Sequence, residues 1–248
     1  MKRTLLEITQ EILNEMDADN VNSIDDTIES QQVAEIVRSC YNEMISNRNW
    51  PHLRNLIQFE ASGTVSKPSH MKLPANVREL SEVKYDVRKT SSGKKEFRTI
   101  SYMEPQEFLS YIASRDSLAS DVQVVNDFSG VQLLIYNDLA PSYYTSFDDE
   151  YLVFDSFNSS IESTLQQSKT QGLAYIEPEW SHEDGAYPDL PPDAFSKLIE
   201  EAKSTAFLTL KQMANEKAEQ RAARQGRWLA LKSWRVDGSL KTPNYGRK

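Results

Sequence analysis

Residues 195–225 read FSKLIEEAKSTAFLTLKQMANEKAEQRAARQ, and a change of pattern inside this stretch decides the expected fold. Its first part has apolar residues spaced three and four apart, as on the buried face of a helix. These residues are Phe195, Ile199, Ala202, Ala206, Leu210 and Met213. After Met213 nearly every residue up to Gln225 is polar or alanine. The pattern predicts one helix about 50 Å long, whose second half projects beyond its own domain.

The sequence before and after this helix defines its ends. Asp189-Leu190-Pro191-Pro192-Asp193 precedes it, and proline suits the first turn of a helix. After it, residues 226–248 combine Trp228 and Trp234 with several basic residues. Such a composition is typical of an interface anchor, so we expect an extended tail that binds a partner. The alternative is that both indoles fold back onto the chain's own helices.

Two further helices are expected at the N-terminus, over Thr4–Met16 and about Thr27–Ser46, each with one apolar stripe. Asp26, with Glu29 three residues later, predicts the N-terminal cap of the second helix. Cys40 falls within its apolar stripe, which indicates a small buried hydrophobe rather than a nucleophile.

Between these helical regions the chain is typical of a β-rich domain. Short runs rich in Val, Ile, Tyr and Phe alternate with turn residues. One helix, Pro105–Ser114, is expected among the strands, and another over Ser160–Leu173 at the end. The expected strands are Ile57–Phe59, Leu80–Val87, Phe97–Ile100, Val122–Val125, Val131–Tyr136 and Tyr151–Phe154.

The predicted fold class is therefore α+β. We expect a helical bundle, made of two N-terminal helices and a long C-terminal helix, with a β-rich insertion domain and an extended C-terminal tail. The expected boundaries are 1–55 for the N-terminal helices, 56–170 for the insertion, 171–225 for the loop and long helix, and 226–248 for the tail.

Charge is distributed unevenly along the 248 residues. From Lys197 onward there are 12 basic and 5 acidic residues, a net charge of +7, whereas the preceding part has 16 basic and 32 acidic residues, a net charge of −16. An acidic body with a basic end indicates two different surroundings. The lack of a long apolar run, the acidic residues near the start and the single cysteine favour folding in a reducing cytoplasm.

No motif indicates an enzyme. His52, His70 and His182 share no metal-ligand spacing, and phosphate-binding glycine loops and nucleophile elbows do not occur. Asp148-Asp149-Glu150 is the densest acidic cluster, and paired carboxylates can perform acid–base chemistry. Its position before a strand favours a solvated turn. We therefore expect no catalytic residues, no cofactor and no metal.

Several segments resemble one family. Ser46-Asn47-Arg48-Asn49-Trp50 stands between the N-terminal helices and the β-rich part, and 143–151 (YYTSFDDEY) and 188–191 (PDLP) follow it. The long helix contains Glu201-Ala202-Lys203-Ser204, and the tail ends 243–247 (PNYGR). In this order, over nearly the whole chain, the segments resemble the podovirus head-to-tail adaptors of the tail tubular protein A type.

The resemblance implies a structural protein of the virion, made in the host cytoplasm and located at the head–tail junction. About twelve copies would form a ring below the portal protein and above the tail nozzle protein, around a channel through which DNA passes without specific binding. It places portal binding in the C-terminal region. The portal-binding residues would be Arg221, Arg224, Arg227, Trp228, Leu231, Trp234, Arg235, Tyr245 and Arg247.

Three other readings stay open. The basic, tryptophan-containing end also suits a nucleic-acid-binding protein, in which arginines contact phosphates and an indole stacks on a base. A hydrolase using Asp148 and Asp149 is a second reading. In the third, the β-rich insertion attaches tail fibres, which is compatible with the adaptor role.

Overall fold

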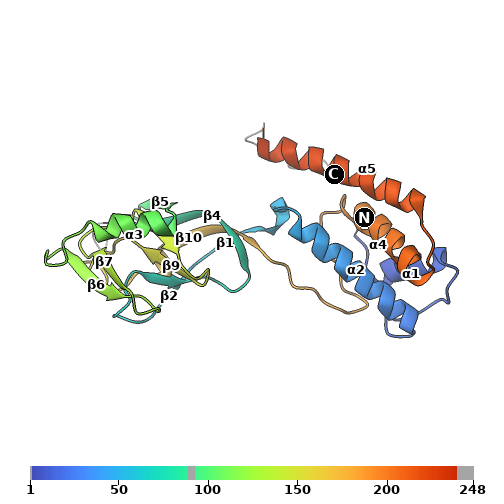
Figure 1. Ribbon diagram of the computed structural model, residues 1–248, viewed down its shortest axis with the longest axis horizontal. Helices are drawn as coiled ribbons and strands as arrows, with labels where there is room; N and C mark the ends of the chain where they lie inside the picture. The colour runs from blue at the N-terminus through green and yellow to red at the C-terminus, as the bar shows by residue number, and fades with distance from the viewer. Residues whose placement is uncertain (1, 89–92, 239–248) are drawn as a thin grey trace. The chain divides into compact units, whose positions relative to one another are not determined.

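The computed structural model describes residues 2–88 and 93–238, with side chains up to Leu231 (Figure 1). The chain forms two compact units. The helical unit consists of Met1–His52 and Pro178–Lys248, and the β unit consists of Leu53–Glu177. The β unit is thus inserted into the sequence of the helical unit. No helix in the described part of the chain is long and apolar enough to span a bilayer.

The helical unit contains α1 (Leu5–Glu15), α2 (Ile28–Ser46), α4 (Phe195–Leu210) and α5 (Glu216–Gly238). Thr4 caps α1 in a capping box with Glu7, and Thr27 caps α2 in the same way with Ser30. The prediction that Asp26 caps α2 is therefore wrong. The Asp26 carboxylate instead accepts hydrogen bonds from the backbone N–H of Asn22 and Ser23, at 2.7 and 2.9 Å.

A buried ion cluster joins α1, near the N-terminus, to α4 within this unit. The Lys203 side chain on α4 is 3% exposed, and its Nζ lies 2.6 Å from Glu11 Oε1 and 2.7 Å from Glu15 Oε1 on α1. Arg3 also pairs with Glu11. A buried ammonium is stable only when it is paired in this way. The cluster therefore fixes α4 against α1.

The β unit is built on an eight-stranded sheet with the order β1-β10-β4-β5-β8-β9-β3-β2. All neighbouring strands are antiparallel except β5 and β8. A separate hairpin pairs β6 with β7, and α3 (Pro105–Ala113) packs against β7 and β8. The strands are β1 (Arg54–Ile57), β2 (Glu60–Ala61), β3 (His70–Lys72), β4 (Val77–Asp86), β5 (Phe97–Tyr102), β6 (Val122–Asn126), β7 (Gln132–Tyr136), β8 (Tyr143–Ser146), β9 (Tyr151–Phe154) and β10 (Thr170–Ile176).

The core of the β unit is one cluster of buried aromatic and aliphatic side chains, among them Phe59, Tyr85, Phe108 and Phe154. Each expected strand overlaps an observed one. However, the helix expected over Ser160–Leu173 is wrong, because residues 170–176 form β10, which lies between β1 and β4. The sequence there alternates buried and more exposed side chains, a pattern that favours a strand once a neighbour pairs with it.

The predicted bundle with a dominant C-terminal helix is also wrong. The largest assembly in the described residues is the curled eight-stranded sheet, and most of the core is β. The C-terminal region forms two helices, because α4 ends at Leu210 and α5 begins only at Glu216. The expected extended tail is wrong as far as Gly238, because α5 continues to that residue.

Candidate interaction surface

α5 begins at a well-defined cap. Asn215 Oδ1 accepts a hydrogen bond from the backbone N–H of Ala218 at 3.1 Å, and Glu216 and Glu219 lie in the first turn. Negative side chains at the N-terminus of a helix stabilise it, because they interact favourably with the helix dipole. The helix packs against α4, beside which it runs in Figure 1. Among the α5 side chains that the structure describes, up to Leu231, the buried ones are Ala218, Ala222 and Leu229.

A second stripe on α5 stays exposed. Its residues are spaced four, three, four and three apart, so they share one face of the helix. Lys217, Arg221 and Trp228 each precede a buried residue of the helix by one position, which turns this face about 100° away from the buried one. The stripe, here called the α5 stripe, consists of Lys217, Arg221, Arg224, Trp228 and Leu231.

The α5 stripe is cationic at one end and apolar at the other. Trp228 is 49% exposed and Leu231 63% exposed, so two large apolar side chains lie one helical turn apart on this exposed face. Arg221 Nη1 lies 3.2 Å from Glu200 Oε1 on α4, so this arginine also helps to hold the two helices together. Arg224, by contrast, is exposed beside Trp228 on the same face. An exposed arginine next to an indole is typical of an interface.

The structure brings together four of the nine residues that the sequence assigned to portal binding: Arg221, Arg224, Trp228 and Leu231. Arg227 is exposed on the neighbouring face. The backbone of Trp234 and Arg235 belongs to α5, but their side chains are outside the described part of the structure. Tyr245 and Arg247 lie outside the described residues altogether.

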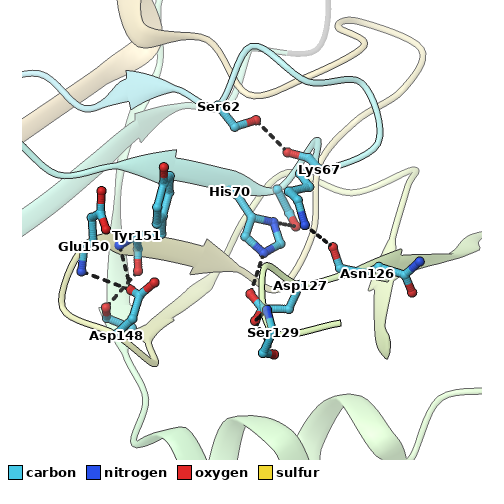
Figure 2. A network of polar contacts seen from close by, with 11 residues as sticks. Ser62, Lys67, His70, Asn126, Asp127, Ser129, Asp148, Glu150 and Tyr151 are labelled. Carbon is cyan, nitrogen blue, oxygen red and sulfur yellow. Dashed lines mark hydrogen bonds and ion pairs between the residues drawn. The ribbon is translucent and has the colours of Figure 1, made fainter. Parts of the chain in front are cut away.

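A polar network in the β unit brings together a second group of titratable residues (Figure 2). His70 points from β3 toward the turn between β6 and β7, where its Nε2 lies 3.1 Å from Asp127 Oδ1. Lys67 Nζ donates to the backbone oxygen of Asn126 at 2.8 Å. Ser129 binds the second Asp127 oxygen through its backbone N–H and its hydroxyl, at 2.9 and 2.6 Å.

The pKa values in this network follow from burial and hydrogen bonding. Burial lowers the pKa of His70, although Asp127 partly opposes the change. Burial alone would raise the pKa of Asp127, but hydrogen bonds from Ser129 and His70 outweigh it and lower that pKa to about 2. A neutral His70 that donates through Nε2 to a charged Asp127 accounts for the lowered pKa of each residue.

Ser69, His70 and Asp127 are the residue types of a hydrolase triad, but their placement does not suit catalysis. Ser69 Oγ lies 3.4 Å from His70 Nδ1, yet Ser69 is 0% exposed, so no substrate reaches its hydroxyl. The network instead holds the β6–β7 turn against β3. Ring contacts add to it, because Phe128 stacks on Tyr151 with centroids 4.1 Å apart.

Asp148 and Asp149, the residues of the hydrolase reading, shape the turn between β8 and β9. Asp148 Oδ1 accepts hydrogen bonds from the backbone N–H of Glu150 and Tyr151, at 3.0 and 2.8 Å. Asp149 has a left-handed backbone, with φ of 59°. Within residues 2–88 and 93–238, no group of three or more His, Cys, Asp or Glu is arranged to hold a metal ion.

Sequence reasoning missed the pairing of His70 with Asp127. The two residues are 57 positions apart and share no motif, so only the folding of the β unit, which places the β6–β7 turn beside β3, brings them together. Comparison with models of known protein families finds no match, and no curated protein is significantly similar to the chain.

Proposed function

We propose that the protein is a non-enzymatic connector subunit that joins a phage portal protein to the tail nozzle protein, as a ring of about twelve copies around the DNA channel of the virion. The exposed α5 stripe is the observation that carries the proposal. It offers an indole, a leucine and an exposed arginine on one face of the helix. Hot spots of protein interfaces are rich in these residue types.

The charge distribution supports the same role. The acidic part of the chain, with its net charge of −16, repels the phosphate backbone of passing DNA. The basic C-terminal part, with a net charge of +7, suits a protein partner with an acidic surface. Tail fibres would be a further partner of the β unit under this proposal.

Binding of the full chain to assembled portal rings tests the proposal. Because α5 continues to Gly238 and buries Leu229, deletion of the C-terminus would expose α4 and confuse the result. Point substitutions avoid this. Arg224→Glu with Trp228→Ala is expected to weaken binding by more than tenfold, because truncation of one hot-spot residue costs about 2 kcal/mol or more.

The matched control is Arg38→Glu on α2. It reverses an exposed arginine of the same unit, whose nearest ion pair, with Glu35, is 3.6 Å long. Portal binding should be unchanged in this variant. Equal affinity of the Arg224→Glu, Trp228→Ala double variant and the unsubstituted chain would refute the assignment of the α5 stripe.

Nucleic-acid binding is a second candidate, because Lys217, Arg221 and Arg224 form a basic row that ends at Trp228. Contacts to phosphate weaken steeply with salt, and an exposed indole can stack on an unpaired base. Titration with duplex and single-stranded DNA at two salt concentrations separates the candidates. The connector role predicts no binding that survives physiological salt.

A further inference from the structure

We infer that residues 211–215, the turn between α4 and α5, are a conformational switch at which the α4–α5 hairpin exchanges with one continuous helix. The inference goes beyond the proposed function and does not depend on it, because it concerns the isolated chain. Three observations within the helical unit carry it, and they concern the backbone of the turn, the contacts beneath α5 and the exposed apolar side chains beside the turn.

The first observation is that a left-handed residue interrupts a sequence that otherwise favours a helix. Gln212 has φ of 54°, a conformation that is unfavourable for any residue with a Cβ atom. Helices that end in this way usually have glycine at that position. Residues 193–225 contain neither glycine nor proline, and Lys, Gln, Met and Ala at 211–214 are all good helix formers. The local sequence therefore favours the continuous helix.

The second observation is that few large apolar side chains hold α5 on α4 in the part of α5 whose side chains the structure describes, Glu216 to Leu231. Of the three that are buried there, Ala218 and Ala222 are alanines, which bury little apolar area. The stem of Lys197 lies against Gly226, with its Cε 3.5 Å from the place where a Cβ would stand. The Arg221–Glu200 ion pair is 44% exposed on the arginine side, so water weakens it.

The third observation is that two large apolar residues beside the turn are mostly exposed in the hairpin, so they contribute little to its stability. Leu208 is 63% exposed and Met213 is 64% exposed. Against these features stands the cap of α5, because Asn215 Oδ1 accepts a hydrogen bond from Ala218 N–H only when a helix starts there. The left-handed conformation of Gln212 thus favours the continuous helix, whereas the cap made by Asn215 favours the hairpin. The position of the equilibrium therefore depends on the balance between these two residues and the packing of α5 on α4.

A distance measurement between spin labels on α4 and α5 tests the inference. Ser196→Cys and Ala230→Cys place exposed labels on the two helices. In the hairpin they lie within a few helical turns of each other, because the start of α4 is beside Gly226. In a continuous helix they are 34 residues and about 51 Å apart. Cys40 is buried and its pKa is raised to about 11 by that burial, so it does not react during brief labelling.

Two variants move the equilibrium in opposite directions. Gln212→Gly relieves the left-handed residue and weakens the continuous helix, so the population at the long distance should fall about tenfold. Gln212→Val with Asn215→Ala makes the left-handed conformation worse and removes the cap, so that population should rise at least tenfold. The control pair Ser39→Cys and Ser196→Cys, on α2 and α4, should keep one distance throughout.

The result that overturns the inference is a single short distance in the Gln212→Val, Asn215→Ala variant. Amide hydrogen exchange in α5 provides a second criterion. Protection of α5 amides should persist in that variant, because α5 stays helical in both states. A long distance accompanied by loss of this protection would show that α5 unfolds and would equally overturn the switch.

Discussion

Gly172 on β10 occupies a position where no larger residue fits. A Cβ atom there would lie 2.7 Å from Ile57 Cγ1 and 2.7 Å from Phe59 Cζ. We expect Gly172→Ala to lower the free energy of unfolding of the β unit by about 1–3 kcal/mol, because the core must shift to admit the methyl group. Urea unfolding followed by circular dichroism measures this loss. Gly185→Ala, with nothing within 4 Å of the new methyl group, should cost much less.

His70 makes the stability of the β unit depend on pH. Burial holds its pKa below the unfolded value of about 6.5, and the nearby charged groups are Asp127, Lys67 and Asp148. The unfolded chain therefore binds a proton at a higher pH than the folded chain does. The contribution of neutral His70 is fully present above pH about 6.5 and is lost as the pH falls below it, by up to about 1.4 kcal/mol per pH unit.

Hydrogen exchange of β3 and β6 amides between pH 7 and 5 measures this loss, after correction for the intrinsic exchange rate. The control is His70→Gln, which keeps a hydrogen-bond donor but does not titrate. Its pH dependence over the same range should be flatter. Identical profiles for the two proteins would show that His70 is not the titrating group.

At the level of elements, the sequence predicted those whose apolar pattern is strong and local. α1, α2 and α3 begin within a residue or so of the expected positions, because their apolar stripes are regular and Pro105 marks the start of α3, although the cap expected for α2 was wrong. β10 was missed, since its residues become a strand only between β1 and β4. The break at Gln212 was missed because no glycine or proline marks it. The assignment of Arg221, Arg224, Trp228 and Leu231 to portal binding stays a prediction; the structure places all four on α5, whereas the sequence analysis put Trp228 and Leu231 in an extended tail.

Gly226 lies in the middle of α5, where alanine would fit. The nearest atom to an added Cβ is Lys197 Cε at 3.5 Å, an ordinary van der Waals contact. Gly226→Ala is therefore expected to raise the free energy of unfolding of the helical unit by about 0.5–1 kcal/mol, because glycine loses more backbone entropy in a helix. All four tryptophans belong to the helical unit, so their fluorescence during urea unfolding reports it. Ala223→Gly, at an exposed position of the same helix, should have the opposite effect.

For the whole molecule, we expect the isolated protein to be largely monomeric and to form its ring only on the portal. Weak contacts that share one template reinforce each other through high effective concentration, whereas the free subunits, with a net charge of −9, repel one another. Native mass spectrometry of the purified chain checks this. A stable ring of isolated subunits at micromolar concentration would contradict the templated assembly.

The buried Lys203 ammonium, bound by Glu11 and Glu15, has a consequence for the order of events on the ribosome. The β unit emerges as one continuous segment, residues 53–177, and can close while synthesis is still in progress. α1 and α2 can pack against each other, but the sides that contact α4 stay uncovered until α4 has left the exit tunnel. While the residues between α2 and α4 are translated, we therefore expect a chaperone that binds apolar surface to bind the nascent segment of α1 and α2.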